Sequence, residues 1–331
     1  MSTTKLSRSL VHGHECYTIE NSQLRVSLLP SLGGKMIELR DLSNGRDWLL
    51  PSQRQSQAYP MPAYGDVFEA YDTSGFDECF PTIEASNGFP DHGELWSRPW
   101  NCAEGEDELV LSIAGVKAGY RFQKRVRLLE NKVTLSYRVT NDDTGQFYFI
   151  WSAHPLLSVT PGMKLLLPES LSRVMMNWAS QDDLGRLGDE KHWPGFLMNN
   201  SLLDFSVVQN VGAAVKCFSD PLEEGFAGVY DPALQQGIML EFNPVVTPYL
   251  GLWLCYGGWP ATAAKKHLTV GLEPCNGRPD ALQSAITREE CGVLKPGASK
   301  EWEIALSVVS GTPSEIISRV RSSQSTPVLQ S

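Results

Sequence analysis

Three side chains far apart in the sequence are the best candidates for proton-transfer chemistry: His92, His154 and Glu273. His92 lies in a turn between Asp91 and Glu94, where neighbouring carboxylates can orient an imidazole and fix its tautomer. Gly93 lets the backbone come close to a ligand. The same pattern also fits a surface histidine that is bonded locally to Asp91, so the spacing alone leaves both interpretations open.

His154 and Glu273 each stand at the end of an apolar run and before a turn. His154 follows the run 147–153 and precedes Pro155, which disfavours helical geometry at the histidine. A histidine desolvated by aromatic neighbours can act as a general acid, and we expect it to be tuned near neutrality. Glu273 follows the alternating run 268–272, and a buried carboxylate there needs a partner or a ligand. A satisfied core histidine and a turn-capping glutamate are the structural alternatives.

The charge pattern favours a neutral, hydroxyl-rich ligand. Asp and Glu number 38 against 28 Lys and Arg, which gives a formal net charge of −10 and argues against binding to nucleic acid or to an anionic membrane. Residues 55–108 contain 12 acids and one base, Arg98. A wall of carboxylates repels phosphates, whereas it accepts hydrogen bonds from sugar hydroxyls. Four tryptophans could supply flat apolar platforms for a sugar, or could simply fill the core: Trp96, Trp151, Trp253 and Trp259.

The elements that must position these residues read as β-strands almost throughout. Apolar residues alternate with polar ones in 108–114, 133–139 and 302–308, a period typical of antiparallel strands with one buried face. The sequence therefore predicts an all-β protein, with a large antiparallel β-sandwich or a closed barrel as the architecture. One helix is expected at 313–320, with Thr312 as its N-cap and Pro313 at its first position.

Length and composition predict one large domain over residues 1–321, with a frayed tail at 322–331. Seven cysteines without a C-x-x-C pair indicate reduced, mostly buried thiols rather than a disulfide framework or a zinc ribbon. Residues 1–10 lack the apolar stretch of a signal peptide, and no run of about 18 apolar residues indicates a transmembrane helix. We therefore expect a cytoplasmic protein.

Six segments, in this order, resemble the galactose mutarotase-like superfamily, in particular its aldose 1-epimerase-related proteins. The segments are Leu29–Ile37, Gly75–Pro81, Pro90–Trp96, Trp151–Pro155, Pro248–Trp253 and Gly271–Pro274. They span roughly residues 20 to 310, nearly the whole chain, and the ordered set is more specific than any one of its members. The resemblance implies a β-sandwich of the large supersandwich type.

The resemblance also implies an activity, the interconversion of the α and β anomers of an aldose by acid–base-catalysed ring opening. Carried over residue by residue, Glu273 matches the family's base, His154 its acid and His92 its supporting histidine. Lys35, Asp77, Glu78 and Trp253 fall on matching motifs and are expected to contact the sugar. The implied partner is a monosaccharide, and the implied chemistry needs no metal, nucleotide or redox cofactor.

This sequence departs from the family pattern at each of the two histidine motifs. Aldose 1-epimerases carry an Asn-Arg pair ahead of the first histidine, whereas no arginine lies between Arg54 and Arg98 here. Gly93-Glu94 replaces the family's Gly-Gly after His92, and Pro155 follows the second histidine in place of its usual setting. These departures affect the identity of the sugar more than the type of catalysis.

Several other functions remain compatible with the sequence. A phosphosugar mutarotase would need cations brought into the site from elsewhere, for instance Arg278. A sugar-binding or regulatory protein on the same fold would bind both anomers without speeding their exchange. A zinc site built from the two histidines and Glu273 lacks the close helical spacing of a local metal motif. A glycosidase or a lyase would need an acid–base pair that we do not find elsewhere in the sequence.

Overall fold

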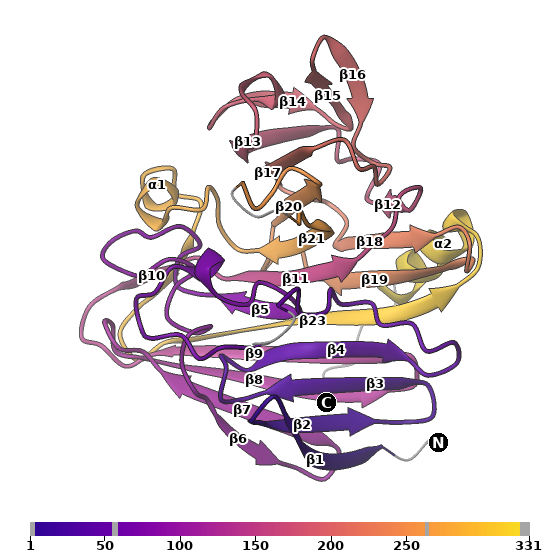
Figure 1. Cartoon of the computed structure of the whole chain (residues 1–331). Coiled ribbons are helices and arrows are strands. Elements are labelled where there is room, and N and C mark those ends of the chain that lie inside the picture. Colours follow the sequence, from indigo (N-terminus) through magenta and orange to yellow (C-terminus); the bar gives the residue numbers. More distant parts are fainter. Residues whose placement is uncertain (1–3, 55–58, 262–264, 325–331) are drawn as a thin grey trace.

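Two large antiparallel sheets stack face to face in the computed structural model, which describes residues 4–54, 59–261 and 265–324 (Figure 1). The first sheet has 11 strands in the order β1-β2-β3-β4-β5-β11-β21-β20-β17-β13-β14, and the second has eight in the order β12-β18-β19-β23-β9-β8-β7-β6. Two short two-stranded ribbons, β10-β22 and β15-β16, complete the strands of the described residues. The predicted all-β sandwich is confirmed, and the barrel alternative is not.

The strands of the 11-stranded sheet are these, in chain order: β1 (Lys5–Val11), β2 (His14–Glu20), β3 (Leu24–Leu29), β4 (Lys35–Asp41), β5 (Phe76–Cys79), β11 (Ser152–Ser158), β13 (Arg173–Ala179), β14 (Glu190–His192), β17 (Ala213–Ser219), β20 (Tyr249–Tyr256) and β21 (Leu268–Cys275).

The second sheet consists of β6 (Asn101–Glu104), β7 (Glu108–Ala114), β8 (Tyr120–Leu129), β9 (Lys132–Asn141), β12 (Lys164–Leu166), β18 (Phe226–Asp231), β19 (Gln236–Phe242) and β23 (Ser299–Ser310). The ribbons are β10 (Phe147–Phe149) with β22 (Gly292–Leu294), and β15 (Gly195–Met198) with β16 (Ser201–Asp204). The helical elements are α1 (Leu282–Thr287), α2 (Pro313–Gln324) and the 3-10 turns η1 (Phe68–Ala70) and η2 (Asp182–Leu184).

Strands β7, β8 and β9 of the second sheet bury alternate residues, as the sequence pattern predicts, whereas nearly every residue of β18 and β19 is buried. In β7, Leu109, Leu111 and Ile113 are buried while the residues between them are partly exposed. In the central strands of the first sheet, by contrast, almost every residue is buried, as in β17 and β21. Both faces of these central strands are therefore covered by other parts of the protein.

The direction of each side chain in β5 follows from this alternation. Glu78 points into the sandwich interior, where Tyr137 and Trp151 donate hydrogen bonds of 2.9 Å to its carboxylate and Lys124 lies 3.3 Å away. Asp77 points to the opposite face and lies in register with His154 of β11. The site described below therefore lies on the outer face of the 11-stranded sheet.

Helix α2 packs on the outer face of the other sheet, where Ile316 and Val320 are buried against Phe226 and Tyr230. The predicted N-cap is confirmed: the amide of Thr312 donates to Glu315 Oε2 at 2.8 Å, and the amide of Glu315 donates back to the Thr312 hydroxyl at 3.4 Å. The helix continues to Gln324, so the first three residues of the expected frayed tail are helical. Residues 325–331 lie outside the described part of the chain.

All seven cysteines are unpaired thiols, five of them buried and two partly buried, which agrees with the expected absence of a disulfide framework. Within the described residues, none of the helices has the length and apolar character needed to cross a membrane.

Candidate active site

Glu273 and His154 lie side by side on the outer face of the 11-stranded sheet. Glu273 is fully buried in β21, and its Oε1 lies 3.7 Å from Nε2 of His154 in the adjacent strand β11. Glu273 Oε1 and His154 Nδ1 are both buried without a hydrogen-bond partner among the described residues. Such orphaned polar atoms are rare in native proteins, because a buried polar atom without a partner costs free energy.

A lysine that the sequence analysis did not single out completes this cluster. Lys216 of β17 forms an ion pair with Glu273 through its Nζ and the carboxylate Oε2. The side chain of Lys216 is 7% exposed. Burying either charge alone would be costly, so each group compensates the other. The two oxygens of Glu273 therefore have different environments, because Oε2 is bound and Oε1 is free.

Two glycines leave the backbone bare around this carboxylate. A Cβ on Gly251 of β20 would lie 3.2 Å from Glu273 Oε2 and 3.3 Å from Lys216 Nζ. A Cβ on Gly271 would lie only 2.9 Å from Glu273 Oε1 and 3.0 Å from the Cβ of Trp253. Side chains at these positions would crowd the ion pair and the free oxygen, so both glycines keep space at the floor of the site.

His92 reaches the cluster from the loop that crosses this face. The rings of His92 and His154 meet edge to face at 5.4 Å, and Phe68 stacks on His92 at 4.1 Å. Phe68 also contacts His154, with ring centroids 5.5 Å apart. The side chain of His92 is 21% exposed, against 10% for His154, so His92 lies nearer to solvent. Glu273, His154 and His92 thus lie together, although their roles remain predictions.

The loop holds His92 through a tight set of contacts. Nδ1 of His92 lies 2.9 Å from Asp91 Oδ1, and its backbone amide donates to Ile83 O at 2.7 Å. A Cβ on Gly93 would lie 1.9 Å from the carbonyl oxygen of Phe80, and Gly93 has a φ of 78°. From its sequence context, Gly93 was expected to let the backbone come close to a ligand. Instead, its missing side chain allows this loop to pack against the backbone at Phe80.

The environment of His154 makes the imidazole hard to protonate. Burial, the neighbouring His92 and the ammonium groups of Lys216 and Lys35 hold the pKa of His154 well below its ordinary value. The expectation that His154 is protonated near neutral pH is therefore wrong for the protein without a ligand. Sequence reasoning paired the imidazolium with Glu273, whereas in the structure Lys216 takes that place.

Lys35 and Asp77 form a second buried ion pair next to His154. The ammonium of Lys35 also donates to the backbone carbonyls of Asp72 at 3.1 Å and Ser74 at 2.6 Å. Its three donors are therefore used within the protein. Burial raises the pKa of Asp77, although Lys35 opposes the shift. The ammonium of Lys35 is therefore bound within the protein and is not free to make the sugar contact that the sequence had led us to expect.

Glu78 is not brought to this cluster. It is fully buried on the interior side of β5, and burial raises its pKa while Lys124 opposes that shift. Adjacent residues of a strand point to opposite faces, so Asp77 and Glu78 cannot both face the same site. The expected sugar contact by Glu78 is contradicted by its position.

Trp253 lies on the site's side of β20, in register with Lys216 and with Gly271. Its ring contacts Trp178 at 5.6 Å and Trp259 at 5.7 Å. Trp151, by contrast, is fully buried in the sandwich interior. Trp253 therefore lies on the same face as Lys216 and contacts Trp259, whereas Trp151 lies in the core.

Asp280 is a further acid near the cluster that sequence reasoning missed. Its Oδ2 accepts a 2.7 Å hydrogen bond from Asn177, while Oδ1 is buried without a partner among the described residues. Burial raises the pKa of Asp280 to about 6, with Lys216 opposing the shift. Its position in the turn seven residues after Glu273 was the available signal. For Lys216 the signal was a single lysine inside the apolar run 213–218.

A cavity lies beside residues that contact Lys35 and Trp253. This cavity of about 320 Å³ is lined in part by Asp72, Ser74, Trp259 and His267. Asp72 and Ser74 are the residues whose carbonyls hold Lys35, and Trp259 contacts Trp253. Glu273, His154, His92 and Lys216 are not among the described residues that line this cavity, which is related to them through Lys35 and Trp253. Its volume is within the range of small-molecule sites.

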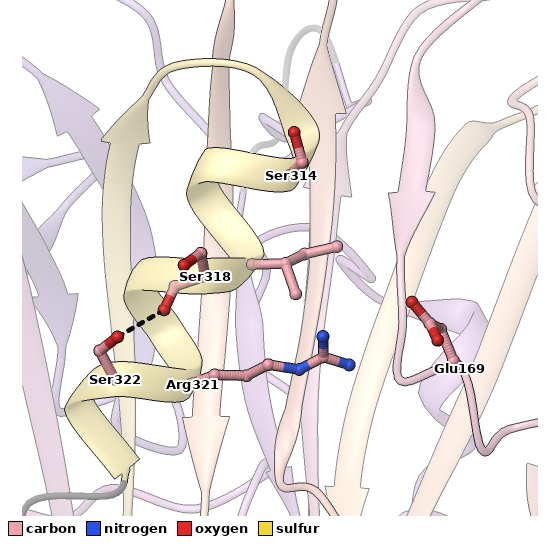
Figure 2. A pocket seen from close by; sticks show the side chains of 6 residues that line it. Glu169, Ser314, Ser318, Arg321 and Ser322 are labelled. Atoms are coloured by element: carbon pink, nitrogen blue, oxygen red, sulfur yellow. Dashed lines mark hydrogen bonds between the residues drawn. The ribbon is translucent and has the colours of Figure 1, made fainter.

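A separate depression of about 660 Å³ lies beside α2 on the other sheet (Figure 2). Arg321 and Glu169 extend toward one another across it, with Ser314, Ser318 and Ser322 along the helix. Arg321 is bound to Glu224 through two contacts of 2.6 and 3.1 Å. None of the residues lining this depression is a histidine, so the acid–base chemistry considered above has no counterpart there.

The described residues contain no group of three or more His, Cys, Asp or Glu side chains arranged to hold a metal ion.

Comparisons with known proteins support the fold. No family model matches the chain, and no curated protein matches its sequence. A solved galactose mutarotase-like protein from Lactobacillus casei is 17% identical with a TM-score of 0.65, covering 88% of this chain and 99% of that one. A proposed aldose 1-epimerase from Klebsiella pneumoniae is 14% identical with a TM-score of 0.69, covering 100% and 92%. Another from Escherichia coli is 18% identical with a TM-score of 0.64, covering 93% and 99%. The chain therefore has the galactose mutarotase-like fold.

Proposed function

We propose that this protein is an aldose 1-epimerase, which interconverts the α and β anomers of a neutral or substituted aldose by acid–base-catalysed ring opening. The observation that carries the proposal is the free oxygen Oε1 of Glu273, buried without a partner 3.7 Å from His154 Nε2. The two oxygens that exchange protons in mutarotation, O1 and the ring oxygen, are both bonded to C1. A base and an acid that serve them must therefore lie close together, as these two atoms do.

The steps follow from the positions of the two groups. Glu273 Oε1 accepts the proton of the anomeric hydroxyl, and His154 donates a proton to the ring oxygen as the bond from C1 to that oxygen breaks. The open-chain aldehyde then rotates about C1–C2. The same pair acts in reverse when the ring closes. General acid–base catalysis of this kind contributes about 10²–10⁴-fold per group.

Charges around the site favour a neutral sugar over a phosphosugar. Lys35 and Lys216 are each paired with a buried carboxylate. Arg278, the cation considered above for a phosphate, instead bonds Ser219 O at 2.6 Å and Glu290 at 3.1 Å. An added phosphate would therefore find neither of these lysines nor Arg278 free to bind it.

The decisive experiment measures anomer exchange by one-dimensional NMR or polarimetry with freshly dissolved hexoses, pentoses and substituted sugars. The wild-type protein is expected to accelerate equilibration of at least one neutral aldose. The variant Glu273→Gln is expected to lose nearly all of this acceleration while keeping the wild-type circular dichroism spectrum. Glu301→Gln, an exposed change on the other sheet, serves as the matched control.

One observation favours a second candidate, a sugar-binding protein without catalysis. The lowered pKa of His154 leaves little of the acid form near neutral pH. Such a protein would bind a sugar, by calorimetry, with equal affinity for both anomers and without any effect on their exchange. The exchange assay therefore separates the two candidates.

A further inference from the structure

Among the residues that the structure describes, three lysines are buried as ion pairs with carboxylates, and one of these pairs includes the proposed base. Lys35 pairs with Asp77, Lys124 with Glu78 and Lys216 with Glu273. Lys35 and Lys124 also bond to backbone carbonyls, those of Asp72, Ser74 and Gly34. For Lys216, the described structure gives one hydrogen-bond acceptor, Oε2 of Glu273.

This difference matters because a lysine that donates hydrogen bonds to backbone carbonyls contributes to the stability of the fold. Lys216 is instead directed at one atom of one side chain. It lies on β17, two strands from Glu273, and reaches the carboxylate above Gly251, whose missing side chain leaves the path open. Strand β20, which lies between the two charged residues, therefore has no side chain at the position over which the ion pair forms.

We infer that Lys216 is a positioning residue of the acid–base machinery, which holds Glu273 by Oε2 so that Oε1 alone is presented to the substrate. The inference rests on the proposed function and deepens it. Without Lys216, the carboxylate would be free to rotate, and its charge would be buried without compensation. Both effects would reduce the fraction of molecules in which Oε1 is a base in reach of the anomeric hydroxyl.

The same ammonium also acts on the acid. Lys216 is one of the groups that lower the pKa of His154, together with burial, His92 and Lys35. Asp91, Asp77 and Asp280 are the acids that face this region from the neighbouring loop, strand and turn. Lys216 therefore favours the charged base and disfavours the charged acid, which links the two groups through one side chain.

The first test compares Lys216→Met, Lys216→Arg and Lys124→Met. Lys216→Met is expected to lower kcat by about 10²-fold with little change in KM, since a misplaced group costs this much. Lys216→Arg, which keeps the charge, should retain more activity than Lys216→Met. Lys124→Met breaks an equally buried pair in the sandwich interior, so it should lower stability but leave kcat of the folded protein near the wild-type value. An unchanged kcat in Lys216→Met, or an equal loss in Lys124→Met, would overturn the inference.

A double variant tests the route of the effect and also guards against a single variant that does not fold. Lys216→Met with Glu273→Gln removes both charges, so no unpaired charge is left buried. If Lys216 acts through Glu273, the double variant should be no slower than Glu273→Gln alone. A further loss beyond that of Glu273→Gln would show an independent role and would contradict the inference.

A measurement without turnover separates this inference from the proposed function. In a histidine-labelled sample, the NMR signal of His154 should titrate at a higher pH in Lys216→Met than in the wild type, with His154→Gln used to assign it. An unchanged titration would overturn the inference even in an active enzyme. If the wild type accelerates exchange of no aldose at all, the proposed function fails, whereas an active wild type with an unaffected Lys216→Met refutes only the role of Lys216.

Discussion

Asp77 lies directly opposite His154 across strands β5 and β11, so both side chains lie on the outer face of the 11-stranded sheet. Glu78, the next residue, points into the sandwich interior and accepts hydrogen bonds from Tyr137 and Trp151. Two consecutive acids of β5 therefore lie on opposite sides of the sheet, Asp77 beside the candidate site and Glu78 in the core.

A substitution of Glu78 should affect stability rather than chemistry. Glu78→Gln is expected to lower the free energy of unfolding by about 1–3 kcal/mol, because a buried, charge-assisted network loses its charge. Urea unfolding measures this loss. Anomer exchange per folded molecule should change far less than in Glu273→Gln, and a comparable loss of activity would place Glu78 in the site after all.

The pH dependence of catalysis should reflect the lowered pKa of His154. If His154 must be protonated in the free enzyme, kcat/KM declines as the pH rises through the lowered pKa, and this decline lies below the ordinary histidine value of 6.5. Exchange rates measured between pH 4.5 and 8 would show it. A rate that stays constant up to pH 8 would rule out His154 as the acid.

The lowered pKa of His154 should also make stability depend on pH, in the direction opposite to that of kcat/KM. Because the folded-state pKa of His154 lies below its unfolded value, the unfolded chain binds more protons in this range and stability falls as the pH drops below about 6.5. Asp280 has the opposite sign, since its raised pKa of about 6 gives a contribution that is lost as the pH rises through that value. Chemical unfolding of the wild type, His154→Gln and Asp280→Asn at several pH values should resolve both. The two variants should differ from the wild type with opposite slopes.

Gly271 offers a steric test of the free carboxylate oxygen. Gly271→Ala would place a Cβ 2.9 Å from Glu273 Oε1, so kcat should fall sharply while stability drops by about 1–3 kcal/mol. Gly145→Ala, where a Cβ would meet nothing within 4 Å, is the control and should behave as the wild type. Steady-state kinetics of both variants decide the matter, and full activity in Gly271→Ala would mean that Oε1 is not the reacting atom.

Trp253 should contribute to binding more than to chemistry. Trp253→Ala is expected to raise KM several-fold with kcat nearly unchanged, because an apolar platform stabilises the bound sugar and the transition state alike. A loss confined to kcat would contradict this role. Trp151→Phe is unsuitable as a comparison, since Trp151 donates to Glu78 in the core.

Most of the architecture was accessible from the sequence because antiparallel strands carry a period of two. The alternation of Leu109, Leu111 and Ile113 predicted β7 and its buried face. The period does not show which face of a central strand meets the site when both faces are buried, as for Asp77 and Glu78. Only the register of β5 with β11 settles that question.

The site was less accessible because its charges compensate one another over long distances in sequence. Lys216 is 57 residues from Glu273, and nothing in the run 213–218 indicates its partner. The same gap explains the error about His154, since an imidazole surrounded by cations differs from one facing a lone carboxylate. Phe68, which covers both histidines, had no signal of its own.

The different environments of the two carboxylate oxygens of Glu273 would restrict how a sugar can bind. If Glu273 Oε1 is the base, the C1 hydroxyl of either anomer must reach this one atom, so the two faces of the aldehyde have to be presented in turn from a fixed direction. A pocket that held the whole molecule rigidly would trap one anomer. Under the proposed function, this protein would therefore bind the far carbons of the sugar and leave the carbonyl end free to rotate.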